Sequence, residues 1–388
     1  MNSIMFYRWG SILEPTLNKY LHRNCINVYE YSRTMSDYHV DSNFSIDCMQ
    51  FIEKNKIEAI ISFDYFPLLS LICAIRNITY ISWIYDCPNL TLESYTLSND
   101  CNYIFCFDEL YTDRLTLAGA KHCFHMPLAG DPEMSPNSKY DTYISDISFI
   151  GGLYNDKNNR FRNVTTWSEY ESGYLESVMS AQKNIYGYNI VLNTLTPKIV
   201  SSIIDKCNIS LGEMYRFNDP QLAADIINQE ISARDREIVL KRISEHHRIT
   251  LYTGSPIPAS LKNPNINLAG IVSYDLEMPQ VFNQSKINLN ITSRTIESGV
   301  PQRVFDILAS GGFCITNYQP EIAQMFEDKV DLVMYSDIQE VDELVSYYLS
   351  HNNERIQIAQ NGHRKILNSY NYNIRINRIF DILSQGAL

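Results

Sequence analysis

The sequence predicts an α/β protein with two domains in tandem, each built on a parallel sheet covered by helices. Three observations lead to this prediction. The chain has 388 residues, more than one small hydrophobic core usually accommodates. Up to about residue 135, short apolar runs alternate with helix-like segments, as is typical of a parallel sheet with helices on both faces. A second series of apolar runs extends from residue 147 to residue 335.

Several predicted strands of the first half lead directly into an aspartate. These pairs are residues 59–63 with Asp64, residues 80–85 with Asp86, and residues 103–107 with Asp108. Because the carboxyl ends of parallel strands line the ligand crevice, we expect the three acids to point toward a cleft. The alternative is that each aspartate caps a following helix or turn. This alternative is weaker for Asp86, because Cys87-Pro88 follows it and no helix begins there.

Turn signals separate the two halves. The segment HMPLAGDP, residues 125–132, ends the first series of strands, and a polar stretch continues to Ser145. The sequence therefore predicts an N-terminal domain of residues 1–135 and a C-terminal domain of residues 136–370.

The C-terminal domain begins with a strand that ends in two glycines. Residues 147–150, Ile-Ser-Phe-Ile, are mostly apolar and precede Gly151-Gly152, which either lets a ligand approach the backbone or makes a plain turn. Residues 160–247 are mainly helical and are expected to form an insertion without a catalytic motif. Strands are expected again at residues 249–252 and 266–270.

Residues 285–318 predict a strand, a glycine turn, a short helix and a second strand. Ile287, Leu289 and Ile291 alternate as a strand requires, and Ser298-Gly299 interrupts the pattern. Pro301 then suits the first turn of a helix, because its φ is fixed and it lacks an N–H. This segment has the order of a ligand-binding βαβ unit.

Arg303 and Asp306 lie three residues apart on this helix and therefore share one face near its N-terminus. Free backbone N–H groups and the helix dipole favour an anion there. Arg303 could bind a phosphate, and Asp306 could accept hydrogen bonds from a ribose diol. The pair thus predicts a site for a nucleoside diphosphate. The alternative is a surface Arg-Asp pair at an ordinary helix end.

The remaining elements complete an α/β domain. Helices are expected at residues 320–326, 338–350, 354–368 and 374–383, and a strand at residues 332–335. Two such domains, with their crevices facing one cleft, suit a reaction between two substrates.

Composition excludes several classes of protein. The net charge of −12 disfavours a nucleic-acid partner, and no apolar run reaches the roughly 18 residues of a membrane span. The N-terminus lacks the pattern of a signal peptide, so we expect a cytoplasmic protein. Nine cysteines without a CxxC pair indicate reduced thiols and no zinc site. No Asp-x-Asp pair, Walker loop or GxGxxG occurs, so we expect neither a metal nor another cofactor.

Six segments together resemble a known family. They are YISWIYDCP around Asp86, HMPLAGD at the domain junction, FIGGLY at Gly151-Gly152, SKINLNIT at Asn290, GVPQRVFDILASGGF at Arg303, and ERIQIAQNGH near the end. They are similar to glycosyltransferases of the GT-B fold, most closely the CgeB-like spore-protein glycosyltransferase family with its uncharacterised N-terminal partner domain. The resemblance spans nearly the whole chain.

The resemblance implies two Rossmann-like domains facing a cleft. The C-terminal domain would bind a nucleotide-sugar donor and the N-terminal domain the acceptor. Residues 371–388 resemble a C-terminal helix that crosses back to the N-terminal domain. Arg303 resembles the ligand of the donor diphosphate, and Asp306 the acid on the ribose, where the family more often has a longer glutamate.

The resemblance also implies the rest of the donor site. Gly151-Gly152 resembles the loop that passes close to the phosphates, and Ile271-Val272 the place where backbone groups meet the base. Further donor-binding candidates are Ser298, Gly299, Tyr154, Tyr274 and Asn290.

Glycosyl transfer imposes two chemical requirements. The site must neutralise charge on the leaving phosphate and, for inversion, must deprotonate the acceptor. Arg303 with the helix N-terminus could meet the first, and Asp86 is our candidate base for the second. A retaining reaction would need no such base. Other acceptor-side candidates are Asp64, Trp83, Asp108 and His125, the last of which could instead be a hydrogen-bonded junction residue.

The sequence therefore predicts a metal-independent glycosyltransferase. The expected donor is a UDP-sugar such as UDP-N-acetylglucosamine, and the expected acceptor a bacterial protein or a cell-surface or spore glycan. One alternative is a sugar-nucleotide epimerase of the same fold, which needs no separate acceptor. The other is a non-catalytic protein that binds nucleotides or glycans.

Overall fold

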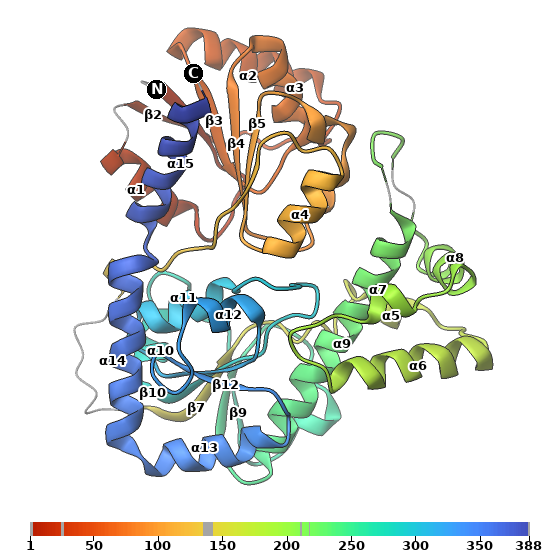
Figure 1. Ribbon diagram of the computed structural model, residues 1–388, viewed down its shortest axis with the longest axis vertical. Coiled ribbons are helices and arrows are strands. Elements are labelled where there is room, and N and C mark those ends of the chain that lie inside the picture. Colours follow the sequence, from red (N-terminus) through yellow and green to blue (C-terminus); the bar gives the residue numbers. More distant parts are fainter. Residues whose placement is uncertain (1–2, 25–26, 135–142, 210–211, 217, 387–388) are drawn as a thin grey trace. The chain divides into compact units, whose positions relative to one another are not determined.

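The computed structural model describes residues 3–24, 27–134, 143–209, 212–216 and 218–386 (Figure 1). The chain forms two compact units, each with its own six-stranded parallel sheet, which confirms the predicted α/β fold class. The N-terminal unit comprises residues 1–129, 211–217 and 371–388, and the C-terminal unit residues 130–210 and 218–370.

The sheet of the N-terminal unit has the strand order β2-β1-β3-β4-β5-β6. Its strands are β1 (Ser3–Tyr7), β2 (Asn27–Tyr31), β3 (Ala59–Phe63), β4 (Thr79–Ile84), β5 (Asn102–Cys106) and β6 (Cys123–His125). Its helices are α1 (Glu14–Asn24), α2 (Ser42–Asn55), α3 (Pro67–Arg76), η1 (Leu90–Glu93), η2 (Tyr95–Ser98), α4 (Glu109–Leu117) and α15 (Tyr372–Gly386). The central strands β3 and β4 are almost wholly buried, as their continuous apolar runs predict.

The C-terminal helix α15 packs within the N-terminal unit. In Figure 1 it is the dark blue helix beside α1. The ring of Tyr372 stacks on Tyr20 of α1, with 5.4 Å between centroids, and meets Trp83 of β4 edge-on at 5.8 Å. This contact explains why a segment so far along the chain belongs to the first unit.

A short segment of the predicted helical insertion also belongs to the N-terminal unit. Tyr215 forms an antiparallel bridge with Ser94, and the Arg216 N–H donates to the Glu93 carbonyl at 2.7 Å. The structure thus differs from the prediction, which assigned all of residues 160–247 to the C-terminal domain. The bonds are between backbones, which sequence patterns do not reveal.

The sheet of the C-terminal unit has the order β12-β11-β10-β7-β8-β9. Its strands are β7 (Ser145–Ile150), β8 (Ile249–Tyr252), β9 (Ile266–Gly270), β10 (Ser285–Asn290), β11 (Cys314–Asn317) and β12 (Val333–Tyr335). Helices outside the insertion are η3 (Pro132–Met134), η4 (Ala259–Leu261), α10 (Met278–Asn283), α11 (Gln302–Ala309), α12 (Pro320–Met325), α13 (Glu340–Ser350) and α14 (Asn352–Ser369).

The helical insertion forms a small core of its own. Its helices are α5 (Arg160–Asn163), α6 (Glu169–Lys183), α7 (Val191–Thr194), α8 (Pro197–Lys206) and α9 (Asp219–Ser244). The first four gather around the long helix α9 (Figure 1). Buried aliphatic side chains, including Leu175, Ile199 and Ile227, fill the space between them. Further along, α9 packs on β8 and α13 and so links the insertion to the sheet.

The boundary between the units falls between Ala129 and Gly130. The predicted boundary at residue 135 and most of the predicted linker lie outside the described residues. The helix of the βαβ unit also begins slightly later than predicted, since Pro301 is its N-cap residue and Gln302 its first residue.

Candidate functional site

Three of the predicted donor residues, Gly151, Asn290 and Arg303, meet where β7 and β10 end. Gly151 directly follows β7, Asn290 ends β10, and Arg303 lies in the first turn of α11. Gly151 has φ +153°, and a Cβ atom at this position would lie 2.5 Å from Arg303 Nη2. The missing side chain of Gly151 therefore makes room for the Arg303 guanidinium against the backbone.

Arg303 is half-buried and held by a polar side chain. Its Nη1 donates to Asn290 Oδ1 at 3.4 Å, and its guanidinium lies 5.7 Å from the Phe149 ring centroid. The Asn290 amide is fixed in turn, because its Nδ2 donates to the hydroxyls of Thr292 and Thr316 at 3.0 and 2.8 Å. These contacts orient the Arg303 guanidinium. Among the described residues, Arg303 forms no ion pair with a carboxylate.

A second arginine, Arg236 of α9, lies at the same strand ends and was not predicted. It is only 2% exposed. Its Nε and Nη2 donate to the Ile291 carbonyl at 3.2 and 2.9 Å, and its Nη1 donates to the Gly152 carbonyl. Burial lowers the pKa of Arg236 to about 10, still well above neutral pH. Arg236 therefore joins the two loops that follow β7 and β10 and places a second buried cation between them.

The ring of Tyr154 covers this second cation. The Arg236 guanidinium lies 4.1 Å from the centroid of the ring, within the range of a cation–π contact. Tyr154 has a left-handed backbone, with φ +56°. The charge of Arg236, followed by that of Arg303, lowers the pKa of the Tyr154 hydroxyl. The cation–π contact and the lowered pKa both show that Tyr154 lies in a positive electrostatic field at the site.

Asp306 lies on α11 behind Arg303 and is 3% exposed. Its Oδ1 accepts hydrogen bonds from the Tyr274 hydroxyl at 2.8 Å and from Gln302 Nε2 at 2.7 Å. Burial raises the pKa of Asp306 to about 7. The bond to Tyr274 also ties α11 to the loop after β9, which carries the predicted base-contacting residues Ile271 and Val272.

The other predicted donor residues have different surroundings. Ile271 is largely exposed, and its Cδ1 lies close to Gly254. Ser298 is buried, and its hydroxyl donates to Glu321 Oε1 at 2.7 Å. Gly299 is buried next to it. Ser298 and Gly299 thus anchor the loop before α11, whereas Ile271 offers an open surface.

In the N-terminal unit the structure brings Asp64 and Asp86 together. Asp64 Oδ1 accepts hydrogen bonds from the backbone N–H groups of Tyr85 and Asp86, both at 3.0 Å. Asp64 is buried with φ +57°, and it does not cap a helix, because α3 begins only at Pro67. Burial, and then the charge of Asp86, raise the pKa of Asp64. Asp86 is exposed to solvent, yet the protein around its carboxyl group desolvates it enough to raise its pKa.

The remaining acceptor-side candidates have other positions. Asp108 is buried and caps α4, because its Oδ1 accepts a hydrogen bond from the Tyr111 N–H at 2.9 Å. Trp83 is fully buried between Phe63 and Tyr372 and contributes to the core. His125 is exposed at the end of the edge strand β6.

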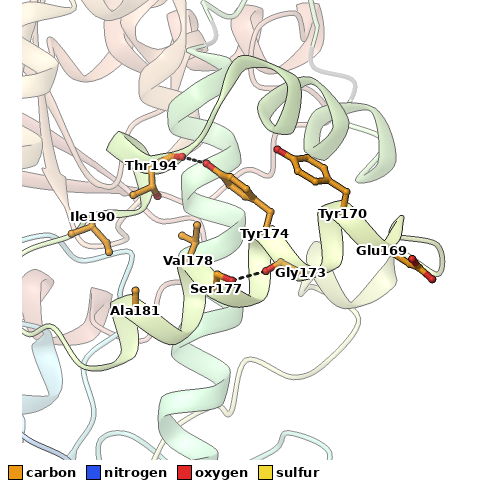
Figure 2. Close-up of a pocket in the computed structure, with 9 residues that line it drawn as sticks. All are labelled: Glu169, Tyr170, Gly173, Tyr174, Ser177, Val178, Ala181, Ile190 and Thr194. Atoms are coloured by element: carbon orange, nitrogen blue, oxygen red, sulfur yellow. Dashed lines mark hydrogen bonds between the residues drawn. The ribbon is translucent and has the colours of Figure 1, made fainter.

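A separate hollow of about 660 Å³ lies in the helical insertion (Figure 2). It is lined by Glu169, Tyr170, Gly173, Tyr174, Ser177, Val178, Ala181, Ile190 and Thr194. The hydroxyl of Tyr174 donates to the carbonyl of Thr194 across it. None of the predicted site residues lines this hollow, so it is distinct from the candidate donor site.

Neither a cluster of metal ligands nor a membrane-spanning helix occurs among the described residues. They include no group of three or more His, Cys, Asp or Glu side chains arranged to hold a metal ion. Among them, no helix is long and apolar enough to cross a membrane.

Comparisons with known proteins bear on both the sequence and the fold. Residues 234–381 match a family model described as glycosyl transferase-like. No curated protein sequence matches the chain. HepE of Anabaena, solved with UDP and glucose, is similar in structure, with a TM-score of 0.56, 8% identity, and 99% of this chain and 100% of that chain covered.

Two further structures are similar over almost their full lengths. Sucrose-phosphate synthase of Thermosynechococcus elongatus has a TM-score of 0.54 and 9% identity, with 99% of each chain covered. The lipopolysaccharide outer core galactosyltransferase WaaB, in its apo form, has a TM-score of 0.51 and 10% identity, with 99% of this chain and 100% of that chain covered. The chain therefore has the GT-B fold of these proteins, and its segment 234–381, which carries Arg236, Arg303 and Asp306, matches the glycosyl transferase-like family.

Proposed function

We propose that this protein is a glycosyltransferase that moves a sugar from a UDP-sugar to a separate acceptor without a metal ion. The observation that carries the proposal is the pair of arginines, Arg236 and Arg303, at the ends of β7 and β10. Neither forms an ion pair with a carboxylate among the described residues. Two cations that lack an anionic partner, beside a glycine that leaves the backbone open, are suited to a diphosphate.

The same two cations support the chemistry of transfer. As the bond between the sugar and the diphosphate breaks, negative charge grows on the leaving UDP, and preorganised cations stabilise that charge. Arg303 would contact the phosphates, while Arg236 would hold the loops in place and add to the field. This is the role that a divalent cation has in metal-dependent transferases, which is why a metal-free reaction is part of the proposal.

Asp306 and the loop after β9 support a nucleoside part of the donor. In this proposal the Asp306 carboxylate accepts hydrogen bonds from the ribose diol, and backbone groups at Ile271 and Val272 contact the base. The choice of UDP is supported by HepE, a protein of the same fold whose structure contains UDP-glucose. UDP-N-acetylglucosamine is the alternative donor in this proposal.

Asp86 is our proposed base for an inverting transfer. Desolvation by the surrounding protein raises the pKa of Asp86, and so raises the affinity of this carboxyl for a proton, as a base requires. The motifs around Asp86 and Arg303 support membership in the CgeB-like family. A bacterial surface or spore glycan, or a protein, modified in the cytoplasm, is the corresponding acceptor.

The test is a turnover assay that measures UDP released from UDP-glucose and UDP-N-acetylglucosamine, with and without candidate acceptors. We expect acceptor-dependent release that EDTA does not reduce, and almost none from Asp86→Asn. Retained turnover in Asp86→Asn would exclude Asp86 as the base. Isomerised donor without any acceptor would favour an epimerase, and donor binding without any turnover would favour a binding protein.

A further inference from the structure

Aromatic rings gather at the carboxyl edge of the sheet in the N-terminal unit. Trp9 follows β1, and Tyr38 lies in the loop after β2, with 41% and 46% of their surfaces exposed. The buried ring of Phe66 lies between them, with its centroid 6.2 Å from that of Trp9 and 5.6 Å from that of Tyr38. Two exposed rings thus flank a buried one, and we call them the Trp9–Tyr38 surface.

The indole of Trp9 is held in place by hydrogen bonds. Its Nε1 donates to the Phe63 carbonyl at 3.0 Å. Its loop is fixed by Glu14, whose Oε1 accepts the backbone N–H groups of residues 9–11 at 2.7 to 3.1 Å. A ring that is already ordered loses little entropy when a ligand stacks on it. Trp9 is therefore exposed but preorganised.

Tyr38 borders a hollow of about 540 Å³, the size of a small-ligand site. His39, Val40 and Tyr215 also line it, and the rings of His39 and Tyr215 meet edge to face at 4.5 Å. The backbone of Tyr38 is anchored, because its carbonyl accepts the Leu68 N–H at 2.8 Å. The surface is thus bounded on one side by a mixed polar and apolar hollow.

A carboxyl pair borders the surface on the other side. Phe63, whose carbonyl holds Trp9, directly precedes Asp64, and Asp64 Oδ1 accepts the backbone N–H of Asp86 at 3.0 Å. The strands β1, β3 and β4 that carry these residues are neighbours in the sheet. Asp86 is exposed, so its carboxylate is open to a ligand at this same edge of the sheet.

Exposed rings beside carboxylates match the chemistry of a sugar. A pyranose has a face of C–H groups, which stacks on an aromatic ring, and an edge of hydroxyls, which donate hydrogen bonds to carboxylates. The acids here, and the net charge of −12, would repel an anionic saccharide. The matching ligand is therefore uncharged.

We propose that the Trp9–Tyr38 surface binds a neutral carbohydrate, stacked on Trp9 with its hydroxyls toward Asp86, and that the acceptor of this protein is a glycan. This inference rests on the proposed function, of which it names the acceptor class. Trp9 and Tyr38 bind and orient the acceptor, and neither takes part in proton transfer.

The test is calorimetry with three neutral disaccharides, maltose, lactose and chitobiose, in the presence of UDP. We expect at least one to bind the wild type. Trp9→Ala should weaken this binding about tenfold, the size of a lost aromatic contact, whereas Trp9→Phe should retain most of it. Tyr170→Ala, which removes an exposed tyrosine of the helical insertion, should leave it unchanged.

Fluorescence gives an independent readout. A bound disaccharide should shield Trp9 from quenching by acrylamide in the wild type, and this shielding should disappear in Trp9→Phe although calorimetry still shows binding. Equal affinities of wild type and Trp9→Ala, or no binding of any of the three disaccharides, would overturn the proposal. Transfer to an unfolded polypeptide but to none of the disaccharides would overturn it in favour of a protein acceptor.

UDP-glucose binding separates this proposal from the proposed function. We expect Trp9→Ala to bind UDP-glucose as the wild type does, because Trp9 lies in the other unit from Arg303. If the wild type binds UDP-glucose but no disaccharide, the proposed glycan site is wrong and the proposed donor site still stands. A wild type that binds no UDP-glucose would instead count against the proposed function itself.

Discussion

Arg236 shows what residue types alone do not reveal about the donor site. Arg303 could be predicted because a glycine turn and a helix start precede it in the sequence. Arg236 lies in a long helix with no motif, and its guanidinium reaches Gly152 and Ile291 only after folding. One feature of the sequence did indicate that Arg236 is buried. Arg236 lies three, four and seven residues before the buried Val239, Leu240 and Ile243, so it occupies the apolar stripe of α9.

Replacing Arg236 by methionine should weaken UDP-glucose binding about tenfold or more, because it removes a buried cation and leaves the buried Ile291 carbonyl without its donor. Calorimetry well below the unfolding temperature measures this. Arg236→Lys should recover part of the affinity, because it restores the charge without the planar fork. The same affinity in the methionine variant as in the wild type would show that Arg236 serves folding alone.

Asp306 should make stability depend on pH. Burial raises its pKa to about 7, so folding favours the protonated form, and its contribution to stability is lost as pH rises from about 4 to about 7. Between pH 5 and pH 8 the wild type should lose about 2–3 kcal/mol of unfolding free energy that Asp306→Asn does not lose. Urea denaturation of both proteins measures this. Identical pH profiles would contradict the raised pKa.

Ionised Asp306 should also improve donor binding. A carboxylate accepts hydrogen bonds from a ribose diol better than a protonated carboxyl does, so UDP-glucose affinity should rise between pH 6 and pH 8. UDP-glucose is a diphosphate diester and does not itself titrate in this range. Asp306→Asn should show weaker binding that is constant with pH, and a parallel rise in the variant would place the titrating group elsewhere.

At the scale of elements, the sequence predicted most strands and the last helices of the chain. Parallel strands that are buried on both faces appear as nearly continuous apolar runs, and β3 and β4 follow this rule, whereas β10 alternates apolar residues with asparagines. The role of Asp64 was open between capping and a site, because both occur after a strand. Its left-handed backbone and its bonds to the end of β4 depend on strand pairing, which a single sequence does not specify.

The helix α15 should stabilise the N-terminal unit from the far end of the chain. Tyr372 is buried against Tyr20 and Trp83, so Tyr372→Ala should cost about 3 kcal/mol or more of unfolding free energy. The emission of Trp83 should shift to longer wavelength at a lower urea concentration. Ile374→Ala, at an exposed position of the same helix, should change stability by less than about 1 kcal/mol. Equal effects of both changes would contradict the packing of α15.

At the scale of the whole molecule, the described residues form a sheet and a hydrophobic core in each unit, and the helical insertion has a core of its own. The order of apolar runs predicted the two sheets. The return of residues 371–388 to the first unit followed only from family resemblance, and the membership of residues 212–216 in that unit was not predicted. Both features arise from contacts between residues far apart in the sequence, which leave no local pattern.

Because the donor residues all lie in the C-terminal unit, donor binding should stabilise that unit in particular. Calorimetric scanning with UDP-glucose should raise the unfolding temperature of one transition. Tyr372→Ala should lower the temperature of the transition that does not respond to UDP-glucose. If UDP-glucose instead shifts the transition that Tyr372→Ala affects, the donor binds to the N-terminal unit, and the donor site at Arg303 is contradicted.

The most direct test of the account is the affinity of UDP-glucose for the wild type and for Arg303→Ala, measured by calorimetry with Arg364→Ala as the control. Arg364 is an exposed arginine of α14 in the same unit. We predict that Arg303→Ala loses about 1.5–3 kcal/mol of binding free energy, the size of a charge-assisted hydrogen bond, and stays folded, while Arg364→Ala binds as the wild type does. Equal affinities of all three proteins would contradict a diphosphate site at Arg303.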